Sequence, residues 1–408
     1  MSVNDSGRYR WVVLLLTCCL CFLGNFSQYQ VSAYATQVMP ALGIDAVGFS
    51  MLFLTPMLAA VFFSLPFGAL GDRVGPKTIV FLGFCFSVLG SIVRIVTMNS
   101  FVGQLVAMFL LGIGMAALTA NNVKTLGLWF GERTGTAMGI YYAVSCLGIA
   151  AAQASSAVVP LVRDSYILSA AALCVCTALW GLLGRNVVSD SDIPEDAATA
   201  PSFKVALRSK SIWLLTAAIS FSLTATTAFA GVLPQALELE RDLSAATSGG
   251  MAAALTVASL FGCLAAPALC ARFKSTKTYL VGVCLTGAMI MAASWFAPDT
   301  GMLWPLLMLN GFATSMMGPV MQAMPVMLPE IGSRYAGSAG GIIAELSLLS
   351  CYVLPIAIAS VAGGNYTAEM VLIAACYALA AVPVVFLPKA IGATPDAADA
   401  APSAAGNK

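Results

Sequence analysis

The sequence predicts an all-α integral membrane protein with twelve transmembrane helices in two pseudo-symmetric six-helix bundles. Three observations lead to this fold class: the composition, the length of the apolar spans, and patterns that recur in the two halves of the chain. Of 408 residues, 60% are hydrophobic and only 9% are charged, whereas a soluble domain has roughly 25% charged residues. Lipid is therefore the main solvent. A net charge of +1 from dispersed charges argues against a nucleic-acid partner.

The apolar spans are long enough to cross a bilayer, which takes about 20 residues of α-helix. The first half has six of them, near residues 11–36, 46–70, 78–98, 101–129, 136–158 and 166–184. The second half also has six, near residues 211–236, 246–270, 278–296, 301–328, 336–361 and 368–388. We therefore expect an N-terminal half over residues 1–185 and a C-terminal half over residues 211–389.

Two segments lack the apolar pattern. Residues 186–210 contain several acids and Pro201, a composition typical of a linker. Residues 390–408 are rich in Ala, Pro and Asp, which predicts a disordered tail.

The basic residues predict the orientation, because Lys and Arg in short loops stay on the cytoplasmic side. An N-terminus inside the cell leaves only Arg163 and Arg241 in outer loops and places most other basic residues in the cytoplasm, namely Arg8, Arg10, Arg73, Lys77, Arg133, Arg185, Lys204, Arg208, Lys210, Arg272, Lys274, Lys277, Arg334 and Lys389. We therefore expect a multi-pass protein of the cell (inner) membrane with both termini and the linker in the cytoplasm.

A cleaved signal peptide is an alternative for the first span. Arg8 and Arg10 precede an apolar run, and Ala33-Tyr34-Ala35 resembles a cleavage site. Cleavage would leave the first half one helix shorter than the second, so the internal repeat favours a retained first helix.

The repeat is visible at two junctions between spans. Arg133-Thr-Gly-Thr-Ala-Met-Gly139 is echoed by Arg334-Tyr-Ala-Gly-Ser-Ala-Gly340, an offset of 334 − 133 = 201 residues. Gly68 to Lys77 is matched more weakly by Pro267 to Lys277, where Arg272 follows Arg73 by 272 − 73 = 199 residues. Parallel six-helix repeats are a transporter architecture, with the solute site between the repeats.

The loop Gly68-Ala-Leu-Gly71-Asp72-Arg73-Val-Gly75-Pro-Lys77 resembles the signature loop of the major facilitator superfamily. The resemblance extends over residues 9–389 and implies two six-helix bundles around a central cavity that opens to each side in turn. It therefore implies a secondary active transporter that moves a small solute by alternating access. A membrane sensor is the non-transporter alternative, and it would normally carry a soluble signalling domain.

The resemblance also implies a cytoplasmic latch. Asp72 would lie at the N-terminus of the eleventh helix, near Ala336, where the helix dipole favours an anion. Arg73 would reach Glu132, and Gly68 would allow the second helix close approach to a partner. The full gating set is Gly68, Asp72, Arg73, Gly75, Glu132, Arg133 and Arg334. A positive-inside loop with turn-forming glycines is the alternative, and Pro76, where the family usually has a basic residue, departs from the pattern.

Residues 121–133 resemble small-solute members such as the cyanate permease and oxalate/formate exchanger groups, and the fifth span lacks the Gly-Pro pair of drug exporters. This favours a small organic or inorganic anion as solute. Export of drugs or transport of an organic cation is the alternative within the superfamily.

Polar residues inside the spans are the candidates for solute binding, because charges in hydrocarbon are costly and usually face a cavity. They are Asn25, Gln28, Tyr29, Asn121, Lys124, Tyr141, Tyr142, Asn310 and Glu345. Lys124 suits an anion, but it also fits a gate that pairs with Glu345, or snorkelling to the membrane surface. Glu345 fits a cation, proton or gate-partner site, or a structural pair. We expect Arg94 to snorkel towards the outer surface.

Other classes of chemistry lack the residues they need. The chain has no histidine, and its twelve cysteines fall inside apolar stretches, so we expect no metal, no cofactor and no enzyme activity. The Met residues between 316 and 327 are interpreted as packing residues. The expected partners are a small-molecule substrate and membrane lipid, with a proton as the candidate coupling ion, for a monomeric protein.

Overall fold

The computed structural model describes residues 3–185, 208–273, 275–298, 300–327 and 332–387. Within these ranges, only the backbone is described for residues 3–8, 72, 132, 135, 323, 325–327 and 332–339. The predicted linker and tail fall almost entirely outside the described residues, so their extents stay predictions. Throughout the described ranges the chain forms helices and no strands.

The helices of the first half follow the predicted spans closely. They are α1 (Val3–Ala33), α2 (Ala35–Leu42), α3 (Ala46–Val74), α4 (Pro76–Val96), α5 (Phe101–Phe130), the 3-10 turn η1 (Gly131–Arg133), α6 (Thr134–Gln153), α7 (Ser155–Val158) and α8 (Val162–Leu183). The short helices α2 and α7 extend the ends of α1 and α6, so six spans are accounted for.

The second half shows the same plan. Its helices are α10 (Lys210–Glu240), α11 (Ala245–Cys270), α12 (Thr276–Trp295), α13 (Thr300–Ser315), α14 (Met317–Met327), α15 (Gly332–Ala362), α16 (Tyr366–Leu379) and α17 (Ala381–Phe386). Eleven stretches of the described helices are long and apolar enough to cross a membrane.

The expected span 301–328 accounts for the difference from twelve, because it is broken into α13 and α14. Pro319 explains the break: proline lacks an N–H donor and its ring clashes with the carbonyl four residues earlier. That residue is Ser315, where α13 ends. Pro383 stands in the same relation to Leu379, the last residue of α16. Both breaks thus coincide with a proline, although Pro56 and Pro66 lie inside the unbroken α3.

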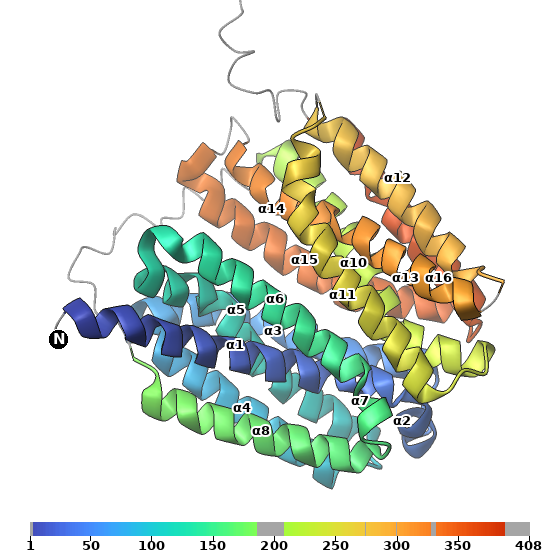
Figure 1. Cartoon of the computed structure of the whole chain (residues 1–408), viewed down its shortest axis with the longest axis horizontal. Helices are drawn as coiled ribbons and strands as arrows, with labels where there is room; N and C mark the ends of the chain where they lie inside the picture. Colours follow the sequence, from blue (N-terminus) through green and yellow to red (C-terminus); the bar gives the residue numbers. More distant parts are fainter. Residues whose placement is uncertain (1–2, 186–207, 274, 299, 328–331, 388–408) are drawn as a thin grey trace, which may run out of the picture.

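The helices of the first half lie together on one side of the molecule and those of the second half on the other (Figure 1). Each half contains its own hydrophobic core. The buried residues of one lie between Val13 and Trp180. Those of the other lie between Ile212 and Leu387, with Ala46 as the one member from the first half among the described residues. Each half thus buries its own apolar surface.

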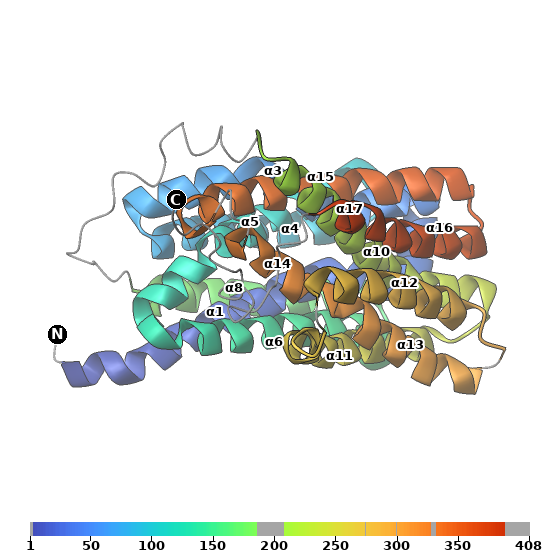
Figure 2. The same cartoon turned by 90° about the horizontal axis from the view of Figure 1, so that it is seen from above.

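The halves meet along two helix pairs, α3 with α15 and α6 with α11, which lie side by side on opposite flanks of the molecule (Figure 2). At one end, α2 also contacts α10 and α7 contacts α11. Between these flanks, α1 and α10 border the space in which the candidate site lies.

Candidate functional site

Two adjoining cavities lie between the halves, with volumes of about 280 Å³ and about 580 Å³. We call the smaller one the Asn310 compartment and the larger one the Glu345 compartment. Both are lined by Ile219 and Leu223 of α10 and by Gln322 of α14. Because they share these residues, the two cavities are neighbours.

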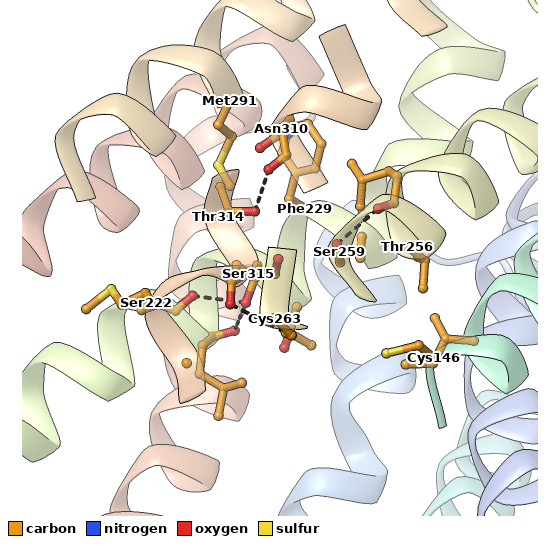
Figure 3. Close-up of a pocket in the computed structure, with 18 of the residues that line it drawn as sticks. Cys146, Ser222, Phe229, Thr256, Ser259, Cys263, Met291, Asn310, Thr314 and Ser315 are labelled. Atoms are coloured by element: carbon orange, nitrogen blue, oxygen red, sulfur yellow. Dashed lines mark hydrogen bonds between the residues drawn. The ribbon is translucent and has the colours of Figure 1, made fainter. Parts of the chain in front are cut away.

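Asn310 is the unsatisfied polar group of the smaller compartment. Its side chain is only 1% exposed, and neither its Nδ2 nor its Oδ1 has a hydrogen-bond partner among the described residues. The neighbouring hydroxyls are engaged in their own helix: Thr314 Oγ1 donates to the Asn310 carbonyl at 2.8 Å (Figure 3), and Ser315 Oγ donates to the Phe312 carbonyl at 3.1 Å. The compartment therefore contains a buried amide without a described hydrogen-bond partner.

Glu345 of α15 supplies a carboxylate to the larger compartment. Its Oε2 is buried and has no hydrogen-bond partner among the described residues. Gln28 of α1 and Gln322 line the same compartment. Among the described residues that line either compartment, none is Lys or Arg, so the local charge is negative when Glu345 is ionised.

Two of the three polar candidates predicted in the first span line the compartments. Gln28 lines the larger one and donates from Nε2 to the Phe53 carbonyl at 3.4 Å. Tyr29 lines the smaller one and packs edge-on against Phe53, with ring centroids 5.1 Å apart. Asn25 instead joins α1 to α6, because its Nδ2 donates to Ser145 Oγ at 3.1 Å and to the Cys21 carbonyl at 2.8 Å.

The other predicted binding residues do not appear among the described lining of either compartment. Asn121 joins α5 to α3 through an Nδ2 hydrogen bond to the Phe67 carbonyl at 3.2 Å. Lys124 donates from Nζ to the Gly71 carbonyl at 3.4 Å. Tyr141 is buried against Tyr142, with ring centroids 5.5 Å apart, and Tyr142 is 53% exposed. The structure thus brings together Gln28, Tyr29, Asn310 and Glu345.

The signature loop forms the turn between α3 and α4. Gly75 has φ 95°, in the region that favours glycine, and its N–H donates to the Gly71 carbonyl at 3.1 Å. No described atom lies within 4 Å of a Cβ built at Gly68, whereas a Cβ at Gly71 would overlap the Asn121 amide oxygen. Among the described atoms, the close approach that we expected at Gly68 is therefore at Gly71.

The latch itself stays a prediction. Arg73 and Arg133 are exposed at the ends of their elements, but the side chains of Asp72, Glu132 and Arg334 lie outside the described residues. The backbone of α15 begins at Gly332, four residues before the expected start near Ala336.

The expectation that Arg94 snorkels to the outer surface is wrong. Its side chain is 1% exposed and lies inside the first half, where Nη1 donates to the Ser27 carbonyl at 2.6 Å. The guanidinium carbon stands 3.7 Å from the centroid of the Tyr166 ring. A cation–π contact and a carbonyl replace water as the partners of this charge.

A set of polar contacts between the halves was missed by the sequence reasoning. Gln153 of α6 is fully buried, donates from Nε2 to the Ala230 carbonyl at 3.0 Å and accepts from Thr256 Oγ1 at 2.7 Å. Nearby, Ser156 donates to the Ala245 carbonyl at 3.1 Å, and Thr36 donates to Glu238 Oε2 at 2.7 Å. The sequence feature that could have indicated these contacts is Gln153 itself, an isolated glutamine at the end of an apolar span.

The described chain has two packed halves, eleven helical stretches long enough to cross a membrane, and cavities between the halves. This arrangement is typical of membrane transport proteins. A model of the major facilitator superfamily matches residues 14–355, and the chain belongs to this family. It is accordingly a multi-pass membrane transporter that works by alternating access, and not an enzyme.

Solved structures of transporters share the fold. A bacterial homologue of the human lysosomal transporter Spinster, in an inward-facing and unoccupied conformation, is 16% identical with a TM-score of 0.72, over 94% of this chain and 95% of that chain. The Escherichia coli fucose:proton symporter is 16% identical with a TM-score of 0.61, over 93% of this chain and 99% of that chain. No curated protein matches the chain by sequence.

Proposed function

We propose that this transporter is secondary active and carries a small organic cation. The observation that carries this proposal is the buried, unpaired Oε2 of Glu345 in a cavity without Lys or Arg among its described lining residues. A carboxylate in a medium of low dielectric attracts a cation and repels an anion strongly.

The anionic solute predicted from the sequence rested on Lys124 and on the likeness of residues 121–133 to cyanate and oxalate/formate carriers. Lys124 is not among the described lining residues, and its Nζ lies at the Gly71 carbonyl. These positions favour the organic cation, which was the alternative within the superfamily.

Glu345 also suggests how transport is coupled. One carboxylate holds either a proton or a cationic group, so the two compete for the same oxygen atoms. Alternating access at such a site exchanges protons for cations across the membrane. Direct exchange of one solute molecule for another needs no proton.

A stability screen of the purified protein tests the charge class, because a ligand that binds the native state raises the melting temperature. The panel comprises primary and quaternary amines, neutral amides, carboxylates, cyanate and nitrate. We expect stabilisation by amines that is lost in Glu345→Gln. The matched control is Glu369→Gln, because Glu369 of α16 is also a buried acid of the second half but is not among the described lining residues. Stabilisation by carboxylates or cyanate that persists in Glu345→Gln would contradict the proposal.

A further inference from the structure

We infer that the solute is elongated and bifunctional, with a hydrogen-bonding group at Asn310 and a cationic nitrogen at Glu345, joined by an apolar segment. The cationic end rests on the proposed function. The other end rests on Asn310 alone, so the two ends can be tested separately.

The Asn310 amide has both a donor and an acceptor to satisfy. Buried polar groups in folded proteins are nearly always hydrogen-bonded, and Asn310 leaves both Nδ2 and Oδ1 without a described partner. Leaving one such group unpaired costs more than an ordinary hydrogen bond contributes to stability. A solute group that accepts from Nδ2 and donates to Oδ1, such as an amide or a hydroxyl, removes this cost.

The protein holds this amide in place by close packing of α13 on α11. A Cβ built at Gly311 would overlap the Leu255 carbonyl oxygen, and one built at Gly262 would overlap the Phe312 carbonyl oxygen. Behind Asn310, Tyr377 donates to the Thr314 carbonyl at 2.8 Å. Because the surrounding backbone is tightly packed and satisfied, the amide is preorganised for a ligand.

The path between Asn310 and Glu345 passes the residues that both compartments share. Ile219 and Leu223 present aliphatic side chains to both, and Gln322 is exposed between them. A solute that reaches from one compartment to the other therefore meets two aliphatic side chains and the Gln322 amide along its middle, and an alkyl segment packs against the aliphatic pair. A compact inorganic ion cannot occupy both ends at once.

Binding of simple probes to the purified full-length protein tests this inference. The probes are primary alkylamines, alkyl amides, and amino amides of increasing chain length that carry an amine at one end and an amide at the other. We expect an amino amide of matching length to bind at least about tenfold more tightly than the alkylamine of equal length, as expected for one satisfied buried amide.

Two substitutions on α13 separate the amide from general packing. Asn310→Leu keeps the shape and removes the hydrogen bonds, so it should bring the ratio of amino-amide to alkylamine affinity, both measured on the variant, down to about one. Thr314→Val lies one turn away in the same compartment, and its hydroxyl is already bonded to the Asn310 carbonyl, so it should retain the advantage of the amino amide. If Asn310→Leu fails to fold, Asn310→Ala gives the same comparison.

The outcomes distinguish the two proposals. An amino amide that binds no more tightly than the alkylamine, or an advantage that survives Asn310→Leu, overturns the bifunctional solute but leaves the role of Glu345 intact. Amine binding that is unchanged in Glu345→Gln overturns the proposed charge class, while an Asn310-dependent preference for amides would then still support the hydrogen-bonding end.

Discussion

Arg94 illustrates at the residue scale how this protein keeps a charge inside a membrane-spanning bundle. The guanidinium lies over the Tyr166 ring at 3.7 Å and donates to a backbone carbonyl of α1. The ring face of Tyr166 thus lies against the guanidinium, and substitution can separate its contribution from that of the hydroxyl.

This distinction predicts different outcomes for two substitutions at Tyr166. Tyr166→Phe keeps the ring and should leave stability nearly unchanged, whereas Tyr166→Leu removes the cation–π contact and should destabilise the protein by about 2 kcal/mol in this desolvated setting. Thermal unfolding in detergent measures both. Equal melting temperatures for the Phe and Leu variants would show that the ring face contributes nothing.

The sequence could predict part of the site and not the rest, for a physical reason. Their position inside apolar spans identified Gln28, Tyr29, Asn310 and Glu345 as candidates, and these line the compartments. The same reasoning selected Asn25 and Asn121, which join neighbouring helices instead. Spacing places a side chain on a helix face, but which neighbour that face meets depends on packing between spans that are distant in the chain.

Among the elements, α3 and α5 depend on a glycine at their crossing. Gly71→Ala should force the Asn121 amide out of its place and destabilise the protein by about 1 to 3 kcal/mol. Gly68→Ala, one turn earlier and without a described neighbour within 4 Å, is the matched control. Thermal unfolding checks both variants. Adding Asn121→Ala to Gly71→Ala should recover part of the loss, and strict additivity of the two effects would contradict the proposed clash.

The polar contacts of Gln153 predict a shift between states. Gln153→Leu removes two hydrogen bonds between α6 and the second half, worth about 1 to 3 kcal/mol together. It should therefore increase about tenfold the population of molecules that are open at the end where Gln153 lies. The control is Gln30→Leu, because Gln30 bonds to Ser165 and Ser169 of its own half.

Labelling with an impermeant thiol reagent measures this shift. The experiment uses a variant in which every cysteine except Cys263 is replaced, because Cys263 lines the Asn310 compartment. By the predicted orientation, the end closed by Gln153 faces outside. Gln153→Leu should therefore accelerate labelling from outside, and Gln30→Leu should not. An unchanged rate in Gln153→Leu would mean that these contacts do not hold the closed end.

The ends of the spans were more predictable than contacts at this scale, but the breaks within spans were not. The breaks after Ser315 and Leu379 coincide with prolines four residues further on, whereas Pro56 and Pro66 lie inside the unbroken α3. The contacts of Gln153 depend instead on how α6 meets α10 and α11, which no local rule specifies.

For the whole molecule, the distribution of Lys and Arg predicts the orientation in the membrane. Ser202 lies in the predicted linker, so Ser202→Cys in a chain without other cysteines should resist an impermeant thiol reagent added to intact cells. The introduced cysteine should react once the cells are permeabilised. Labelling in intact cells would reverse the predicted orientation, including the side to which Gln153 is assigned.

The central claim is that Glu345 binds a cationic solute in the cavity between the halves, and counterflow of a labelled organic amine into proteoliposomes tests it most directly. Three proteins are compared: wild type, Glu345→Gln and Lys124→Gln. Wild type and Lys124→Gln should accumulate the amine with similar half-saturation, whereas Glu345→Gln should need at least about tenfold more, as expected for a lost charge-assisted contact. Full amine counterflow by Glu345→Gln, together with counterflow of a carboxylate that disappears in Lys124→Gln, would contradict the account.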